Sequence, residues 1–343
     1  MNNLWKMFFL VSSLFVLSGC ASSEPEKPSF DSSLYEGRPI DTLTSDAAPL
    51  SEMEAIQRGD IALSNNNIDL ALYEYIRALS FPDAQHQDKT LYTIGRIHQS
   101  RDNTVYAEKA FLASVEYNPN NVQVLEQLGS IYMKQGSVQQ GKSYFYRALN
   151  ADQVRLKNPN TLSDTVELVE IRQLQVDKDS PALAYMGLGI VADIEAQHEF
   201  AKVFYHKAIE VKPNSVKALL NLGYSYYMSG SYTSAKRYTM SALEKDPNNE
   251  KAQNNLALIY LGKGEIKRAI NVFMRHMDAA EALNNVGYFL ILQGKPDKAV
   301  PYLQQAIDKK PSYYPVANEN LERALAEVRA ITPDAAETSN ALQ

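Results

Sequence analysis

The chain has 343 residues, more than one typical globular domain, and 45% of them are apolar while 22% are charged. This balance is that of a soluble chain with a sizeable core, and it argues against wholesale disorder and against a membrane protein with many spans. Lys and Arg total 34 against 40 Asp and Glu. The net charge of -6 argues against a dedicated nucleic-acid binder, which needs many phosphate contacts. The single cysteine, Cys20, excludes a disulfide framework and a multi-cysteine metal site.

The N-terminal segment has the pattern of a secretory signal peptide. An apolar run of 11 residues, Met7 to Leu17, follows the positive Lys6. A helix that crosses a bilayer needs about 20 apolar residues, so this run fits the core of a cleaved signal peptide, which we place at residues 1–19. The sequence at its end, Leu-Ser-Gly-Cys at residues 17–20, resembles the lipobox of bacterial lipoproteins.

The lipobox resemblance implies that Cys20 is the lipid attachment site. The chain would be cleaved before this residue, with a diacylglycerol on the sulfur and a further acyl chain on the amine. Several acyl chains give lasting membrane attachment. Ala21 follows, where many lipoproteins of the inner membrane carry Asp, so the family's sorting rule implies the periplasmic face of the outer membrane. The inner membrane stays open, and no cofactor besides the covalent lipid is expected.

Residues 20–50 are predicted to be a disordered tether. They are rich in Ser, Pro, Asp and Glu and show no sustained apolar period. About thirty residues at roughly 3.3 Å each reach about 100 Å when fully extended. The folded part of the chain could therefore work away from a lipid surface.

A period of 34 residues dominates the rest of the sequence. Gly95 and Gly129 are 34 residues apart, Gly189 and Gly223 are also 34 apart, and Ala257 follows after another 34. Apolar residues recur at fixed offsets from each of these positions, and a proline such as Pro213 or Pro247 closes several copies. These spacings resemble the tetratricopeptide repeat, a helix-turn-helix unit of 34 residues. The resemblance implies an all-α, right-handed solenoid of about seven repeats.

Steric reasoning about two antiparallel helices agrees with this resemblance. Small residues at the eighth and twentieth positions let the two helices of a repeat approach closely, while larger residues at positions 4, 7, 11 and 24 fill the space between repeats. A single repeat cannot bury its apolar face alone, so stability depends on stacking. The seven eighth positions are Gly59, Gly95, Gly129, Gly189, Gly223, Ala257 and Gly287.

Two irregular gaps divide the array. Between Gly129 and Gly189 the gap is 60 residues, and the surplus contains an apolar period at Leu162, Val166, Val169 and Leu174. We therefore expect three repeats at 51–150, an inserted helix or linker at 151–181 where the solenoid bends or breaks, and four repeats at 182–313. Between Ala257 and Gly287 the gap is only 30, which favours a shortened turn between repeats over a functional hinge. A capping helix at 314–331 and a disordered tail at 332–343 complete the chain.

No catalytic or metal-binding motif is present in the sequence. It has no Gly-rich phosphate loop, no H-E-x-x-H and no G-x-S-x-G. His198 and His206 are eight residues apart across the turn of one repeat, which is a poor metal site. A cell-wall hydrolase with repeats would need a catalytic domain of about 100 residues, and no segment outside the repeats is that long. We expect no enzyme.

The candidate partner-binding row lies on the first helices of the last repeats. Asparagines there can offer a donor and an acceptor to the backbone of a bound peptide or helix, and flanking tyrosines add amphipathic contact area. Tetratricopeptide repeats also favour asparagine at the sixth position for structural reasons, so a purely structural role stays open. The row consists of Lys217, Asn221, Tyr224, Tyr227, Lys251, Asn254, Asn255, Asn284, Asn285 and Tyr288.

The order of segments narrows the function to a membrane-anchored scaffold for a protein partner. A lipobox, a polar tether and about seven repeats, with Ala-Leu-Asn-Asn-Val-Gly-Tyr at 282–288, resemble the TadD family of lipoproteins in tight-adherence (Flp) pilus assembly. The resemblance implies an outer-membrane secretin as the partner, whose assembly the lipoprotein assists. The alternatives are a type IV pilus pilotin and an adaptor for outer-membrane assembly factors or cell-wall enzymes.

Overall fold

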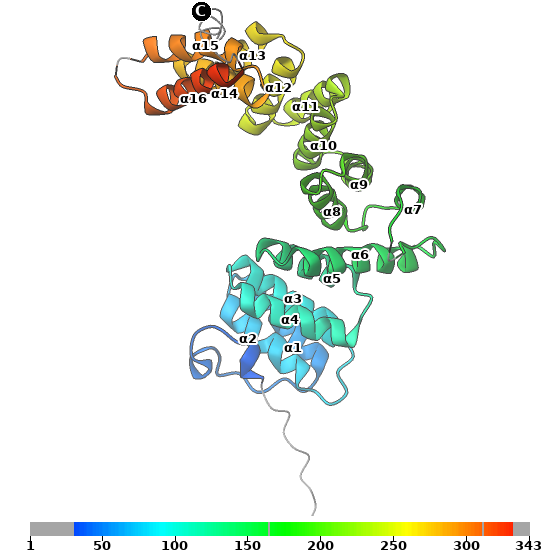
Figure 1. Cartoon of the computed structure of the whole chain (residues 1–343). Helices are drawn as coiled ribbons and strands as arrows, with labels where there is room; N and C mark the ends of the chain where they lie inside the picture. Colours follow the sequence, from blue (N-terminus) through cyan, green and yellow to red (C-terminus); the bar gives the residue numbers. More distant parts are fainter. Residues whose placement is uncertain (1–30, 164, 311, 332–343) are drawn as a thin grey trace, which may run out of the picture. The chain divides into compact units, whose positions relative to one another are not determined.

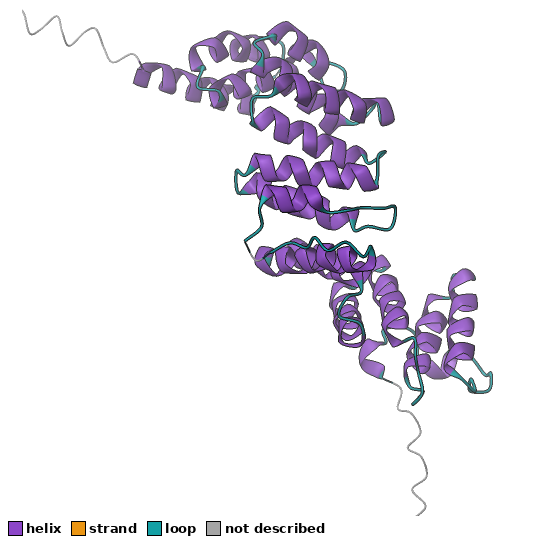
Figure 2. Cartoon of the chain, turned by 90° about the vertical axis from the view of Figure 1, so that its right-hand side faces the viewer, coloured by secondary structure: helices purple, strands orange, loops and turns teal. Residues whose placement is uncertain are grey.

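The chain folds into helices throughout the residues that the structure describes. The computed structural model describes residues 31–163, 165–310 and 312–331, and no strand occurs in these ranges (Figures 1 and 2). The first three helix pairs are α1 (Glu52–Ser64) with α2 (Ile68–Leu79), α3 (Gln87–Ser100) with α4 (Thr104–Tyr117), and α5 (Val122–Lys134) with α6 (Val138–Arg155). The short α7 (Leu168–Gln173) comes next. The last four pairs are α8 (Ala182–Ile194) with α9 (His198–Val211), α10 (Val216–Met228) with α11 (Tyr232–Lys245), α12 (Glu250–Gly262) with α13 (Ile266–Phe273), and α14 (Ala279–Leu292) with α15 (Pro296–Asp308), before a final α16 (Pro315–Ile331).

These pairs confirm the all-α array of helix-turn-helix repeats predicted from the 34-residue period. The turn inside each pair holds one residue with a left-handed backbone. Four turns place a glycine there, with φ between 69° and 80°: Gly136, Gly230, Gly264 and Gly294. The other three turns use Asn66, Asp102 and Ala196 at φ of 57° to 58°. Of these three, Ala196 is the residue type that this conformation disfavours, by roughly 1 kcal/mol. Within the described ranges no helix is both long and apolar enough to cross a membrane.

Close contact between the eighth and twenty-fourth positions joins the two helices of a repeat. A Cβ atom added to the glycine would lie only 2.4–2.7 Å from the opposing side chain in five repeats. The pairs are Gly59 with Tyr75, Gly95 with Phe111, Gly129 with Phe145, Gly189 with Tyr205 and Gly287 with Leu303. The alanines at the twentieth position, such as Ala71, Ala107 and Ala201, are fully buried. The small residues therefore have the packing role that the sequence predicts.

The chain divides into two compact units, residues up to Thr90 and residues from Leu91 onward. In the first unit the prediction of a disordered tether is wrong for residues 31–50. Leu34 and Leu43 are buried there, and the segment carries two 3-10 helices, Ser32–Leu34 and Ile40–Thr42. Arg38 forms an ion pair of 3.1 Å with Asp69 of α2. Leu34 and Leu43 need no helical period to be buried, because they cover the surface of the first repeat.

The signal peptide, Cys20 and the rest of the predicted tether, residues 21–30, lie outside the described residues, as does the predicted tail. The final helix α16 spans Pro315–Ile331, where a capping helix was expected. Its buried residues Ala317 and Ala324 face the core of the last repeat, and Asn320 donates a hydrogen bond of 2.9 Å to Asn284 of α14.

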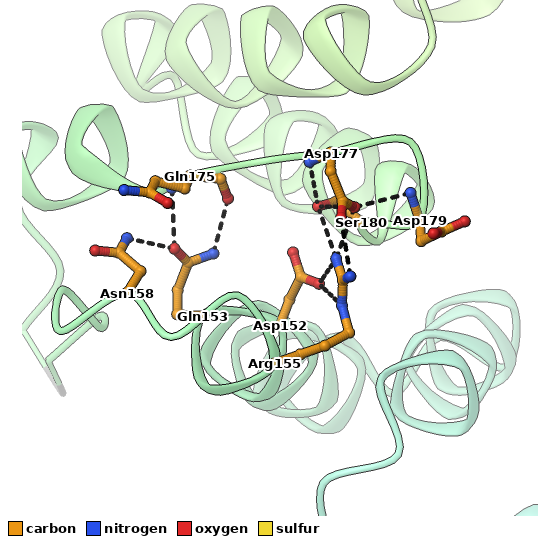
Figure 3. Close-up of polar contacts among 8 residues, drawn as sticks. All are labelled: Asp152, Gln153, Arg155, Asn158, Gln175, Asp177, Asp179 and Ser180. Carbon is orange, nitrogen blue, oxygen red and sulfur yellow. Dashed lines mark hydrogen bonds and ion pairs between the residues drawn. The ribbon is translucent and has the colours of Figure 1, made fainter.

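The segment expected as an inserted helix or linker at 151–181 is mostly irregular, and beyond the end of α6 its described residues hold the six-residue helix α7. Two amide side chains of α6 hold its backbone by paired hydrogen bonds. Asn150 bonds both the N–H and the carbonyl of Leu162, at 2.8 and 3.0 Å. Gln153 bonds both groups of Gln175, at 2.9 and 3.0 Å, as Figure 3 shows. Because side chains satisfy this backbone, the segment can be fixed without forming a helix.

Ion pairs fasten the far end of the insertion. Arg155 pairs with both Asp152 and Asp177, each at 2.7 Å (Figure 3). The Arg155 hydrogen bond is the main reason that the pKa of Asp177 lies far below its usual range. Asp152 is fully buried, and its burial raises the pKa of its carboxyl group. The apolar side chains of the insertion, Leu162 and Leu174, join the core that contains Phe145.

The array does not break at the insertion. Helix α8 packs directly against α5 and α6, and the inserted residues run beside this contact. A Cβ atom on Gly187 of α8 would lie 2.3 Å from the ring of Phe145, which also contacts Gly129 of its own repeat. Glu126 of α5 accepts hydrogen bonds from the N–H groups of Leu183 and Ala184, at 2.7 and 3.2 Å, and so caps α8 across the insertion.

The short gap before the last repeat arises within a helix. Helix α13 has only eight residues, Ile266–Phe273, whereas the other second helices of the array have twelve or more. The turn that follows leads to Asp278, whose side chain accepts from the Glu281 N–H and caps α14. The gap is short because α13 ends early. The expectation of a shortened turn between the repeats is therefore wrong.

We predict that Gly187→Val destabilises the second unit by about 2–3 kcal/mol, because the new side chain has to displace the Phe145 ring in a packed contact. Ala326→Val on the exposed side of α16 is the matched control and should cost at most about 0.5 kcal/mol of helix propensity. Urea unfolding followed by circular dichroism measures both. Equal stabilities for the two variants would mean that α6 and α8 are not packed together.

Candidate protein-interaction surface

The predicted partner-binding residues all lie on α10, α12 and α14. These helices contact one another in sequence, together with α8, so the solvent-facing residues of the four helices form one continuous surface, here called the first-helix face. The second helix of each repeat packs behind it.

Most of the predicted asparagines are bonded within the fold. Asn284 is buried and accepts the hydrogen bond from Asn320 of α16. The side-chain oxygen of Asn254 lies 3.0 Å from Nε2 of His276, and Asn285 donates to the sulfur of Met277 at 3.3 Å. Asn255 is half-buried. These contacts support the structural role for Asn254, Asn284 and Asn285.

Asn221 differs from the other asparagines of the row. It is half-buried on α10, and its Nδ2 atom is covered but has no hydrogen-bond partner within the described part of the chain. A buried donor without an acceptor costs about 1–3 kcal/mol. Among the predicted asparagines, Asn221 is therefore the one whose covered donor is left without an acceptor in the described residues.

The predicted tyrosines of α10 form a cluster that the sequence reasoning described only in part. The rings of Tyr224 and Tyr227 lie 6.2 Å apart, and Tyr232 at the start of α11 lies 5.9 Å from Tyr227. Tyr232 fits there because Gly262 of α12 has no side chain, and a Cβ atom at that position would lie 2.6 Å from the ring. Burial raises the pKa of Tyr227, so its hydroxyl stays a neutral donor at neutral pH.

Apolar side chains extend the tyrosine cluster along the face. Tyr224 is 40% exposed and Tyr288 is 36% exposed, while Met228 and Leu292 at the ends of α10 and α14 are 47% and 52% exposed. Sequence reasoning missed Met228, Leu292 and Tyr232. The signal was present in the repeat numbering, because Met228 and Leu292 both occupy the thirteenth position of their repeats, next to the predicted row.

The two predicted lysines lie at one edge of the face. Lys217 and Lys251 are exposed and line a shallow pocket together with Leu220, Asp246 and Asn249. This pocket is open to solvent, and Asp246 and Glu250, which also line it, balance the charge of the two lysines. Such an open edge suits a polar segment of a protein partner more than an enclosed small molecule.

The histidine and carboxylate side chains of the described ranges are spread among separate partners. No group of three or more His, Cys, Asp and Glu side chains is arranged there to hold a metal ion. His198 lies 2.8 Å from Asp193, and His206 contacts the hydroxyl of Tyr226, so the two histidines face different partners. Cys20 lies outside the described residues.

Comparison with known families identifies the repeats. Models of the tetratricopeptide repeat match residues 122–154, 217–249, 250–276 and 279–310. These segments cover the helix pairs α5/α6, α10/α11, α12/α13 and α14/α15. Tetratricopeptide repeats mediate protein–protein interaction, and proteins built from them are typically scaffolds without enzymatic activity. No curated protein matches the chain.

Solved structures with a similar arrangement share little sequence with the chain. A tetratricopeptide repeat protein from Parabacteroides merdae is 17% identical, with a TM-score of 0.49, over 81% of this chain and 100% of that one. PilF of Pseudomonas aeruginosa is 15% identical, with a TM-score of 0.43, over 80% and 97%. PilW, a type IV pilus biogenesis factor, is 14% identical, with a TM-score of 0.42, over 81% and 100%. At these values the likeness says nothing about what this chain binds.

We predict that Asn284→Ala destabilises the second unit by about 1 kcal/mol, since it removes the hydrogen bond that ties α16 to α14. Asn221→Ala should leave stability unchanged or raise it slightly, because it removes a covered donor without a partner. Thermal unfolding of the two purified variants distinguishes these roles. A larger loss for Asn221→Ala than for Asn284→Ala would mean that the Asn221 amide is bonded within the folded protein.

Proposed function

We propose that this chain is a membrane-anchored scaffold lipoprotein whose first-helix face binds a protein partner during pilus or secretin assembly at the outer membrane. The observation that carries the binding role is the exposed tyrosine and aliphatic surface of α10 to α14. Solvent-exposed tyrosine and methionine side chains next to one another are typical of protein interfaces. The exposed Lys217 and Lys251 add polar contacts for the same partner at the edge of this face.

The proposed anchor rests on the sequence around Cys20. An apolar run that is too short to span a bilayer ends at Leu-Ser-Gly-Cys, which is the pattern of a lipoprotein signal. Lipidation at this residue would leave only residues 20–30 between the lipid and the first described residue, Asp31. Because residues 31–50 pack on the first repeat, the reach of the tether is about one third of what the sequence alone suggested.

The proposed partner is an outer-membrane secretin of the tight-adherence (Flp) pilus. The support for this finer assignment is the order of segments, a lipobox followed by repeats up to the C-terminal capping helix, which resembles the TadD family. A type IV pilus pilotin, or an adaptor for outer-membrane assembly or cell-wall enzymes, would use the same anchor and the same face. The two experiments below separate the anchor from the partner.

Cys20→Ser should abolish incorporation of labelled palmitate into the protein and move it from the membrane fraction to the soluble fraction. The physical reason is that the thiol is the acceptor of the diacylglycerol, whereas a hydroxyl is not. Ser18→Ala, two residues away, serves as the control and should leave labelling intact. Unchanged labelling of the Cys20→Ser protein would contradict the assignment of this chain as a lipoprotein.

Replacing Tyr224 and Tyr288 by alanine should lower the amount of assembled secretin multimer in cells at least about tenfold, because each exposed tyrosine of an interface contributes roughly 1–2 kcal/mol. Tyr313→Ala is the matched control, since that side chain is 77% exposed and does not belong to the first-helix face. Multimers are measured on gels without heating, and helical content is checked on the purified variants. Normal multimers in the double variant would reject the secretin role of this face.

A further inference from the structure

The opposite side of the second unit carries a cluster of basic and aromatic side chains that the proposed function does not use. It lies where α9, α10 and α11 meet. The rings of Tyr226 and Tyr238 are stacked, with centroids 5.4 Å apart and an angle of 6° between the planes. His206 of α9 approaches both rings edge-on, at 6.3 and 5.6 Å. The cluster therefore joins three helices of two neighbouring repeats.

Two cations lie over the faces of these rings. The Nζ atom of Lys202 is 5.0 Å from the centre of the Tyr226 ring, and the guanidinium of Arg237 is 4.7 Å from that of Tyr238. Arg237 also donates a hydrogen bond of 3.1 Å to the Tyr238 hydroxyl, whose own proton is then available for another acceptor. Cation–π contact holds both charges in fixed positions. Arg237 is exposed, whereas Lys202 is buried.

Negative charge is scarce at this place. Lys202 pairs with Glu199, which is largely exposed, and the exposed Arg237 has no carboxylate within 4 Å among the described residues. Burial, followed by the charges of Arg237 and Lys202, lowers the pKa of His206. Glu199 balances the buried Lys202, so the positive charge that the cluster presents to solvent is that of Arg237.

The same arrangement recurs one repeat further along. Lys236, which is 34 residues after Lys202, lies 5.4 Å above the ring of Tyr260, itself 34 residues after Tyr226. Arg268 of α13 lies 5.9 Å from the same ring. The half-buried Lys236 and the exposed Arg237 and Arg268 therefore form a row along α11 and α13, in which Glu265 pairs with Arg268. We call the residues Lys202, His206, Tyr226, Lys236, Arg237, Tyr238, Tyr260 and Arg268 the basic face.

We propose that the basic face is a docking surface for the phosphate headgroups of an anionic phospholipid membrane. A row of cations along α11 and α13 matches an extended anionic surface better than a single small anion, which one cluster would hold. Tyrosine hydroxyls beside Arg and Lys supply neutral donors for phosphate oxygens, and tyrosine is a side chain of the membrane interface. Each basic side chain near an anionic lipid surface raises membrane occupancy roughly fivefold. The proposal does not depend on the anchor at Cys20 or on the secretin.

The test uses the rate at which diethyl pyrocarbonate modifies His206, measured by peptide mass spectrometry on the full chain as purified from cells. This reagent attacks neutral imidazole, which the lowered pKa of His206 favours. The chain is mixed with vesicles of phosphatidylglycerol and phosphatidylcholine, or with vesicles of phosphatidylcholine alone. Any lipid anchor acts equally in both, so the comparison isolates the headgroup. His86, whose side chain is 41% exposed in the first unit, is the internal reference.

We expect modification of His206 relative to His86 to slow several-fold with phosphatidylglycerol and not with phosphatidylcholine. The variant Lys236→Gln/Arg237→Gln should lose this protection, whereas Arg323→Gln, a half-exposed arginine of α16, should keep it. Equal rates in both kinds of vesicle would overturn the proposal. So would protection by inorganic phosphate with no further effect of the lipid, or protection by polyglutamate alone, which would assign the face to an acidic protein.

Discussion

The structure depends on one contact within each repeat. A glycine on the first helix lies against an aromatic or aliphatic side chain of the second helix. In five repeats the eighth residue is a glycine so close to the twenty-fourth that even a methyl group would not fit. This contact sets the distance between the two helices of a repeat. The distance in turn determines how the next pair can stack, and stacking buries the apolar residues that a single pair leaves exposed.

Phe145 shows how the same contact carries the array across an insertion. Its ring lies between Gly129 of its own repeat and Gly187 of the next one, so the two repeats share one side chain. The inserted residues do not separate them. Asn150 and Gln153 bind the inserted backbone to the side of α6, and Glu126 caps α8 directly. The helices that carry the first-helix face, from α8 onward, therefore belong to the same packed unit as α5 and α6 before the insertion.

The sequence was sufficient to predict the repeats because their signal is periodic. Glycines at a spacing of 34 and alanines twelve residues after them have a steric meaning that needs no knowledge of the neighbours. The insertion and residues 31–50 were not predictable in this way, because they are held by single contacts such as Arg38 with Asp69 and Gln153 with Gln175. Nothing in the composition of these segments distinguishes a chain that packs on a preformed surface from one that does not.

The candidate site was predictable in position but not in detail. The row on α10, α12 and α14 was found from the repeat numbering, yet Asn254, Asn284 and Asn285 are bonded to residues of the turn after α13 and of α16, whose positions depend on tertiary packing. Tyr232 joins the face only because Gly262, on the neighbouring helix α12, leaves room for its ring. The first-helix face offers a ligand an aromatic and aliphatic surface, beneath which the donor of Asn221 is covered. The basic face is a separate surface with different chemistry.

The central claim is that the repeats on both sides of the insertion form one cooperative unit. Native-state hydrogen exchange tests it most directly, because it reports the free energy at which each helix opens. We expect the buried amides of α5, α6, α8 and α9 to exchange through a common opening. Their free energies of opening should agree within about 1 kcal/mol and fall together when urea is added. An opening of α8 and α9 at clearly lower free energy, while α5 and α6 stay protected, would contradict it.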